Sequence, residues 1–139
     1  MDKLKAVREV FIVAETLPIK GMAFPIKIGP LGHFEGLSGS AKLKSNIKAI
    51  VMTALGDRLM RPRFGNLGFA YVFRNVDSAT CTLLETATAE AIARHEPRVT
   101  VVGVSCSQGI EYGWIRTHVQ YRINASGVFE QLETQIPGA

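Results

Sequence analysis

The stretch ARHEPRVTVVGV, residues 93–104, decides the fold, because a helix-like run ends and a strand-like run begins within it. Pro97 has no backbone N–H to donate, and its ring pushes the residue before it out of the helical region. After it comes a run with strong β preference, made of Val99, Val101, Val102 and Val104. The stretch therefore predicts a sharp junction between a helix that ends near His95 and a strand that starts at Val99.

Two main helices are predicted upstream of this junction. The first can be capped by Ser38 or Ser40 and closed by Gly56 in a left-handed conformation. The second can be capped by Asp77 or Ser78 and runs to about His95. The expected inner faces, spaced by three and four residues, are Leu43, Ile47, Ile50, Val51 and Ala54 in the first helix, and Leu84, Ala87, Ala91 and either Ile92 or His95 in the second. Between the helices, Phe69, Tyr71, Val72 and Phe73 are expected to anchor the connection in the core.

A mostly antiparallel sheet is predicted downstream. Residues 114–123 alternate between apolar and polar side chains, which is typical of a half-buried strand. Residues 124–127 have the composition of a turn, and residues 128–133 offer a weaker last strand. Near the start of the chain, the Phe24–Ile28 segment suits an edge strand or an extended segment, because Pro25 cannot donate to a ladder. The pattern predicts an α+β fold with two main helices on one face of a small sheet, whose other face and at least one edge stay available.

Residues 1–20 are predicted to form an extra, N-terminal amphipathic helix, with a separate domain over residues 21–139. Leu4, Val7 and Phe11 repeat at helical spacing within residues 3–17 and make an apolar stripe. Isolated helices of this length are marginal in water, so the stripe must be buried somewhere. It can pack on its own domain or act as an arm that docks on a partner subunit, and both alternatives stay open.

Composition excludes several classes of protein. The 139 residues fit one globular domain, and no apolar run reaches the roughly 20 residues of a membrane span. A signal peptide is not expected, which favours a cytoplasmic origin. The net charge of +4 is dispersed apart from Arg58, Arg61 and Arg63 in one loop, so solvated charge is favoured over nucleic-acid binding.

Neither a disulfide nor a metal site is predicted. Cys81 and Cys106 are interpreted as reduced core thiols, as expected for two cysteines in a cytoplasmic protein. The histidines, His33, His95 and His118, have no ligand spacing with them. No cofactor is expected.

A set of short motifs occurs in a fixed order along residues 21–123. They are Gly21-x-x-Phe24-Pro25, Gly56-Asp57-Arg58, Met60-Arg61-Pro62-x-Phe64-Gly65, Val72-Phe73, Glu96-Pro97-Arg98 and Tyr121-Arg122-Ile123. This ordered set resembles the gpW / gene-twenty-five-like baseplate wedge family of contractile phage tails and related contractile injection systems. The chain departs from that family at Asp57, where Glu is usual, and in its N-terminal helix and its His33-Phe34-Glu35 region.

The resemblance implies a sheath-handshake-like fold and a structural role in the virion baseplate, or the equivalent injection-particle baseplate, assembled in the bacterial host cytoplasm. It implies that Glu96, Pro97 and Arg98 face larger baseplate wedge proteins, with six copies of the chain per tail. It also implies that the tail sheath protein docks by adding a strand to this chain's sheet, a mode in which main-chain hydrogen bonds give affinity. The strand that carries Val128, Phe129 and Gln131 is the expected docking edge.

The residues themselves leave two alternatives at the charged motifs. Glu96 and Arg98 can form a local ion pair, worth little if exposed, or a rigid charged corner for a partner. Arg58, Arg61 and Pro62 could suggest a phosphate site, but the loop lacks the glycine pattern of a phosphate cradle, so structural anchoring or partner contact is favoured. One hypothesis is that Glu96 accepts hydrogen bonds from Arg58 or Arg61.

An enzyme is not predicted. A muramidase needs two carboxylates across a cleft, one with a raised pKa. The candidates are Glu35, Asp57, Glu85, Glu90 and Glu96, and neighbouring arginines would lower the pKa of Glu96. The rival to a structural role is a cytoplasmic anti-adaptor or regulatory binding module on the same fold, because fold does not fix function.

Overall fold

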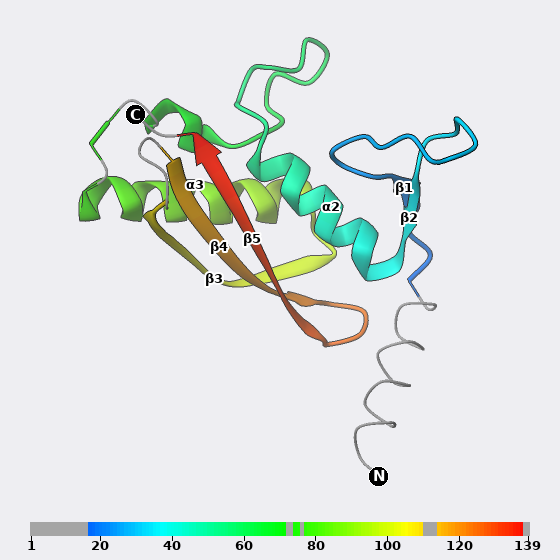
Figure 1. Ribbon diagram of the computed structural model, residues 1–139. Helices are drawn as coiled ribbons and strands as arrows, with labels where there is room; N and C mark the ends of the chain where they lie inside the picture. The colour runs from blue at the N-terminus through cyan, green and yellow to red at the C-terminus, as the bar shows by residue number, and fades with distance from the viewer. Residues whose placement is uncertain (1–16, 72–73, 76, 110–113, 138–139) are drawn as a thin grey trace. The chain divides into compact units, whose positions relative to one another are not determined.

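The computed structural model describes residues 17–71, 74–75, 77–109 and 114–137. The chain divides into two compact units, Met1–Asn46 and Ile47–Ala139. The second unit contains the junction after Glu96, the arginine loop (residues 56–65) and a three-stranded sheet (Figure 1). Most of the predicted N-terminal helix, including Leu4, Val7 and Phe11, lies outside the described residues, as do Val72 and Phe73. Among the described residues, every helix is too short or too polar to span a bilayer.

The first unit contains a small antiparallel ladder. Strand β1 (Lys20–Met22) pairs with strand β2 (Gly36–Ser38). Of the two structures predicted for Phe24–Ile28, an edge strand or an extended segment, the chain adopts the extended segment. Within it only Ile28 makes a β-bridge, to Phe34. The backbone N–H of Phe24 donates instead to the Ser45 hydroxyl at 2.8 Å.

Helix α2 (Gly39–Val51) begins where predicted but ends earlier than its apolar spacing suggested. Beyond Val51, the Thr53 hydroxyl donates back to the carbonyl of Ala49, and the backbone N–H of Ala54 donates to the Asp57 carboxylate. Side-chain bonds of this kind compete with helical ones. Gly56 does adopt a positive φ, +95°, but in the turn after the helix and not as its cap.

Asn66 anchors the connection between the helices. Its side chain is fully buried, donates to the Thr88 hydroxyl at 3.0 Å and accepts from the Gly68 N–H at 2.8 Å. Its backbone N–H donates to the Thr53 carbonyl at 2.8 Å. The aromatic anchors predicted here are less buried, because Phe69 and Tyr71 in the 3₁₀ helix η1 (Leu67–Tyr71) remain half-buried.

Helix α3 (Ser78–His95) agrees with its prediction at both ends. Asp77 is the N-cap, and its carboxylate accepts from the Thr80 N–H at 2.7 Å. This bond lowers the pKa of Asp77, because the charged form is the better acceptor. The buried face contains Thr80, Leu84, Thr88, Ala91 and Ile92. The two buried threonines were not predicted, and Ala87, which was, is half-buried.

The second unit is built on an antiparallel sheet in the order β3–β4–β5, with strands β3 (Val99–Gln108), β4 (Trp114–Ile123) and β5 (Phe129–Pro137). Helix α3 packs along β3 and lies behind the sheet in Figure 1. The inner row of β4 is buried as the alternation predicted, at Ile115, Thr117, Val119, Tyr121 and Ile123. The last strand is longer than predicted and continues to Pro137. The predicted α+β class is confirmed.

A bulge in β3 explains why the alternation of its side chains is interrupted at Val101 and Val102. The register with β4 shifts between Val101 and Gly103, so that Val102 is the extra residue and is more than half exposed. Without that shift Val104 would face the same way as Val102, because side chains alternate along a strand. The bulge returns Val104 to the inner face.

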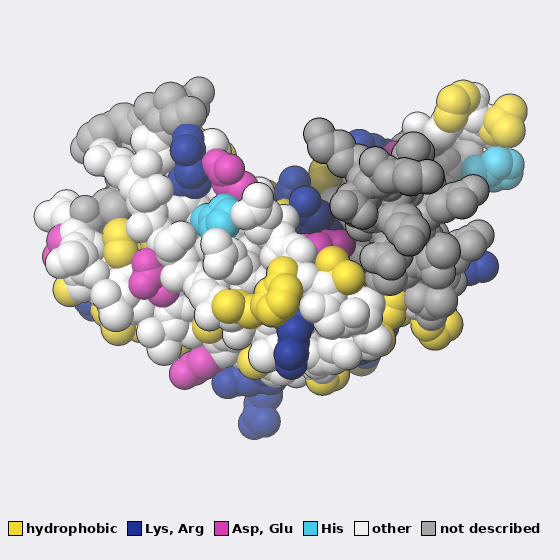
Figure 2. All heavy atoms as spheres, turned by 90° about the horizontal axis from the view of Figure 1, so that it is seen from below, with side chains coloured by type: hydrophobic (Ala, Val, Ile, Leu, Met, Phe, Trp, Pro, Cys, Tyr) yellow, Lys and Arg dark blue, Asp and Glu magenta, His cyan; other side chains and the backbone are white. Residues whose placement is uncertain are grey.

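The outer face of the sheet is mostly polar. Its β4 and β5 positions carry Arg116, His118, Gln120, Arg122, Gln131, Glu133 and Gln135, with the exposed Trp114 and Phe129 at the strand ends. Arg116 and Glu133 form an ion pair across the strands at 3.1 Å. In the space-filling view from below, hydrophobic side chains reach the surface only in small separate groups among polar and basic ones (Figure 2). The face therefore does not resemble a second core surface.

Replacing Asn66 by Ala should destabilise the second unit. The change strands the buried N–H of Gly68 and the hydroxyl of Thr88, and unsatisfied buried polar groups cost about 1–3 kcal/mol. Urea denaturation should show this loss in the free energy of unfolding. The matched variant Asn75→Ala, at an exposed position, should change it little. Equal stability of the two variants would show that Asn66 does not anchor the connection.

Candidate functional site

The junction after α3 is organised by a buried carboxylate. The Glu96 side chain is only 2% exposed, whereas that of Arg98 is 50% exposed. The Nε and Nη2 atoms of Arg98 donate to the two carboxylate oxygens at 2.5 and 2.7 Å. The hydrogen bond that Arg98 donates to Glu96 raises the pKa of Arg98, so the guanidinium stays charged. The pair is thus a two-pronged fork with one buried and one half-exposed partner, unlike a fully exposed ion pair.

Asn124, in the turn between β4 and β5, clamps the backbone of the same junction. Its side-chain amide donates to the Pro97 carbonyl at 3.1 Å, and its backbone N–H donates to the Arg98 carbonyl at 3.0 Å. Its side-chain oxygen accepts from the Thr100 hydroxyl at 2.6 Å. Sequence reasoning assigned Asn124 only to a turn, because nothing in the sequence places that turn beside Pro97.

The arginine loop, residues 56–65, consists of successive tight turns. The Arg61 N–H donates to the Arg58 carbonyl at 3.0 Å, and the Phe64 N–H donates to the Arg61 carbonyl at 2.9 Å. Pro62 takes the second position of the latter turn, which its fixed φ favours. Gly65 has a φ of +120°, and a Cβ there would lie 2.5 Å from the Thr53 carbonyl oxygen, so only glycine fits.

An aromatic stack joins this loop to the end of α3. The Arg58 guanidinium lies 3.9 Å from the centre of the Phe64 ring, and that ring lies 4.9 Å from the centre of the His95 ring. Contacts of cations with aromatic faces are attractive by about 0.5–1 kcal/mol when exposed. The loop and the junction are therefore tied together by Arg58, Phe64 and His95, one residue before Glu96.

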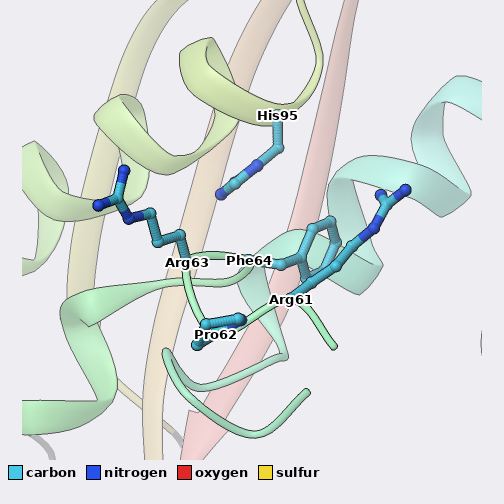
Figure 3. A pocket seen from close by; sticks show the side chains of 5 residues that line it. All are labelled: Arg61, Pro62, Arg63, Phe64 and His95. Atoms are coloured by element: carbon cyan, nitrogen blue, oxygen red, sulfur yellow. The ribbon is translucent and has the colours of Figure 1, made fainter. Parts of the chain in front are cut away.

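A hollow of about 300 Å³ opens between the loop and the helix end, lined by Arg61, Pro62, Arg63, Phe64 and His95. Figure 3 shows His95 reaching down from the end of α3 toward Phe64, while Arg61 and Arg63 extend from the loop in different directions. The Nε2 atom of His95 is buried and makes no hydrogen bond with the described residues. The sequence predicted His95 as a helix-face residue and gave no sign of its contact with the arginine loop.

The structure thus brings together the two charged motifs that the sequence singled out. Glu96 and Arg98 form the junction, Arg58 is stacked on the loop's own Phe64, and Arg61 and Pro62 are exposed beside the hollow. The expected edge strand is a separate feature of the same unit. The docking stripe of Leu4, Val7 and Phe11 belongs to the part of the chain that is not described, which ends at residue 16.

The outer edge of β5 carries main-chain groups that pair with no other described strand. The Ile123 N–H donates to the Val128 carbonyl, which makes this a hydrogen-bonded pair. Such pairs alternate with unbonded ones along an antiparallel ladder, and the β4–β5 register has no shift. The N–H and C=O groups that point away from β4 therefore belong to Phe129, Gln131, Glu133 and Gln135. Of the three predicted edge residues, Phe129 and Gln131 face outward, whereas the Val128 carbonyl is used within the hairpin.

Several of the described carboxylates are engaged in structural contacts. Glu85 accepts from the Cys106 N–H at 2.9 Å, and Glu130 accepts from the Tyr121 hydroxyl at 2.8 Å. Burial, and after it the bond to Glu130, raise the pKa of Tyr121, which stays neutral. No group of three His, Cys, Asp or Glu side chains among the described residues could hold a metal ion. Glu85 and Glu130 are thus used by the fold of the second unit.

A family model for baseplate wedge protein gp25 matches residues 37–128 of the chain. No curated protein matches. Among solved structures, a candidate tail lysozyme from Geobacter sulfurreducens is similar, with 27% identity, a TM-score of 0.68, and 73% of this chain and 93% of that chain covered.

Two baseplate structures have a similar fold. A chain of the anti-feeding prophage baseplate shares 21% identity and a TM-score of 0.61, with 92% of this chain and 91% of that chain covered. A chain of the postcontracted pyocin R2 baseplate shares 23% identity and a TM-score of 0.50, with 82% and 99% covered. At these identities the likeness concerns the fold alone.

Replacing Arg98 by Ala should lower the free energy of unfolding by about 1–3 kcal/mol, because it leaves the buried Glu96 carboxylate without its fork. The free energy of unfolding of Arg98→Lys should lie between those of the wild type and Arg98→Ala, since lysine keeps the charge but not the two-pronged geometry. The control is Arg122→Ala, an exposed arginine on the outer face of the sheet. If Arg98→Ala and Arg122→Ala unfold at the same denaturant concentration, the fork does not hold the junction.

Cys106 should react slowly with iodoacetamide in the native protein. Burial, as the largest cause, raises the pKa of its thiol to about 11, and the thiolate is the reactive form. In a Cys81→Ser variant, the native labelling rate should therefore climb with pH toward a midpoint near 11, and the urea-unfolded rate toward about 8.5. Because the folded pKa is the higher one, this thiol also stabilises the fold below the unfolded pKa and loses that contribution between the two values. Coincident labelling midpoints would contradict the assignment.

Proposed function

The chain belongs to the family of baseplate wedge protein gp25, and we propose that it is a structural subunit of the baseplate of a contractile tail or injection machine. In this role it binds larger wedge subunits through the junction and the arginine loop. It also offers the tail sheath its first docking site, by strand addition to β5. Six copies per tail, and assembly in the bacterial host cytoplasm, belong to the same proposal.

The observation that carries the proposal is the open edge of β5. Its outward N–H and C=O groups, at Phe129, Gln131, Glu133 and Gln135, pair with no other described strand. Exposed edges of this length promote aggregation, and natural proteins usually shorten or cover them. An added strand would satisfy these groups, and the alternation of side chains would set its register.

The wedge surface is supported by the way the junction is built. Glu96, buried and forked to Arg98, fixes the position of the exposed Pro97 and of the half-exposed Arg98. The stack of Arg58, Phe64 and His95 places the arginine loop next to that corner. Rigid charged groups suit partner binding, because little side-chain freedom is lost on association.

A muramidase activity has less support, although one similar structure is a candidate tail lysozyme. A glycosidase needs an acid and a second carboxylate on either side of the scissile bond. Glu96 is paired with Arg98, and Glu85 accepts a backbone hydrogen bond. The hollow beside the junction is lined by no carboxylate.

A proline at Gln131 tests the docking edge. The Gln131 N–H points outward, so Gln131→Pro removes a donor for an added strand while an edge strand tolerates it. The variant should give a soluble monomer and assembled baseplates, but tails without sheath in electron micrographs. Gln131→Ala, which keeps the N–H, should assemble sheath normally. Sheath of normal length on the proline variant would place the docking edge elsewhere.

A further inference from the structure

The tip of the arginine loop exposes two large apolar side chains. Leu59 is 98% exposed and Met60 is 94% exposed. They occupy the corner of the turn that the Arg61 N–H and the Arg58 carbonyl close. Exposed apolar residues are common, but two adjacent, almost fully exposed ones at the corner of an ordered turn contribute nothing to the described core.

The inner part of the loop is held in place, and its outer part is not used by the fold. Gly65 fits closely against the Thr53 carbonyl, and Arg58 stacks on Phe64. The Asp57 carboxylate accepts from the Ala54 N–H. Leu59, Met60, Arg61, Pro62 and Arg63 are exposed beyond these contacts. We call these five residues the loop tip.

The charge of the loop tip is of one sign. Arg61 and Arg63 flank Pro62, and among the described residues neither makes an ion pair. Asp57, the nearest acid along the chain, is engaged with a backbone amide. A partner that covers this tip must therefore supply carboxylates, because arginine charges that lose water without a counter-charge are costly to bury.

We propose that the loop tip is an anchor that inserts Leu59 and Met60 into an apolar slot on a larger wedge subunit, with Arg61 and Arg63 paired to carboxylates on the rim of that slot. This inference rests on the proposed function and adds the contacting residues and the partner's chemistry. Central apolar anchors surrounded by polar rims are the usual arrangement of binding hot spots. The ordered turns reduce the entropy lost on docking.

A protein slot fits the tip better than a membrane surface does. Stable attachment to a bilayer takes an amphipathic helix or two lipid-directed signals, whereas this tip has one turn with two apolar side chains. The two are nevertheless separable by experiment, since a basic tip with apolar residues could also adhere to anionic lipid.

The test uses the full chain, retained on an affinity-tagged preparation of the wedge subunits from its own particle. One variant, Leu59→Ser with Met60→Ser, removes the anchor and keeps the charge. A second, Arg61→Glu with Arg63→Glu, reverses the charge and keeps the anchor. The controls are Leu31→Ser, at another apolar side chain with 86% exposure, and Lys44→Glu, at another exposed cation.

Both loop-tip variants should melt at the wild-type temperature, because the altered side chains are exposed. Each should bind the wedge subunits roughly tenfold more weakly or worse, the effect typical of hot-spot residues. Wild-type binding should weaken as salt rises, and the charge-reversed variant should lack this dependence. The two controls should bind like wild type.

If the wild-type chain binds the wedge subunits and both loop-tip variants bind them equally well, this inference is overturned and the proposed function stands. Failure of the wild-type chain itself to bind the wedge subunits would instead overturn the proposed function. Cosedimentation with phosphatidylglycerol vesicles tests the alternative that the loop tip binds an anionic lipid surface. Vesicle binding that the serine variant loses, while it still binds the wedge subunits, would replace the protein slot by a lipid surface.

Discussion

At the end of α3 the Glu96 carboxylate, almost inaccessible to water, accepts two hydrogen bonds from the Arg98 guanidinium. The surface proposed to bind wedge subunits is arranged around this contact. Burying Glu96 costs solvation free energy, which the fork to Arg98 offsets only if its geometry is kept. The pair is therefore better understood as a constraint on geometry than as a source of stability. It fixes the angle at which the chain leaves the helix and enters β3, and with it the position of Pro97.

Two other contacts extend this constraint to distant parts of the chain. Asn124 donates hydrogen bonds to the carbonyls of Pro97 and Arg98, so the turn between β4 and β5 is attached to the junction. His95 stacks on Phe64, so the arginine loop is attached to it as well. The surface proposed to bind wedge subunits and the hairpin that leads into the proposed sheath edge thus share one rigid corner. Substitutions at this corner are expected to affect both.

The arginine loop shows how one motif can serve both fold and function. Gly65 and Arg58 are explained by contacts inside the protein, a close backbone approach and a stack on Phe64. Leu59 and Met60 have no such explanation, because nearly all of their surface is open to solvent. Residues that the fold does not need, on a loop that the fold holds in place, are the ones to test for binding.

The sequence by itself determined the secondary structure wherever the apolar pattern was long and regular. The ends of α3, the span and inner face of β4 and the turn after Ile123 followed from capping, alternation and turn chemistry. Tertiary structure decided the features that local sequence patterns do not specify. It buried Asn66 against Thr88, inserted a bulge at Val102 opposite β4, and brought Asn124 to Pro97. These outcomes depend on contacts between residues far apart in the chain, and local propensity contains no information about such partners. The early end of α2 is different, because the side-chain bonds near Thr53 are local and compete with the next helical turn.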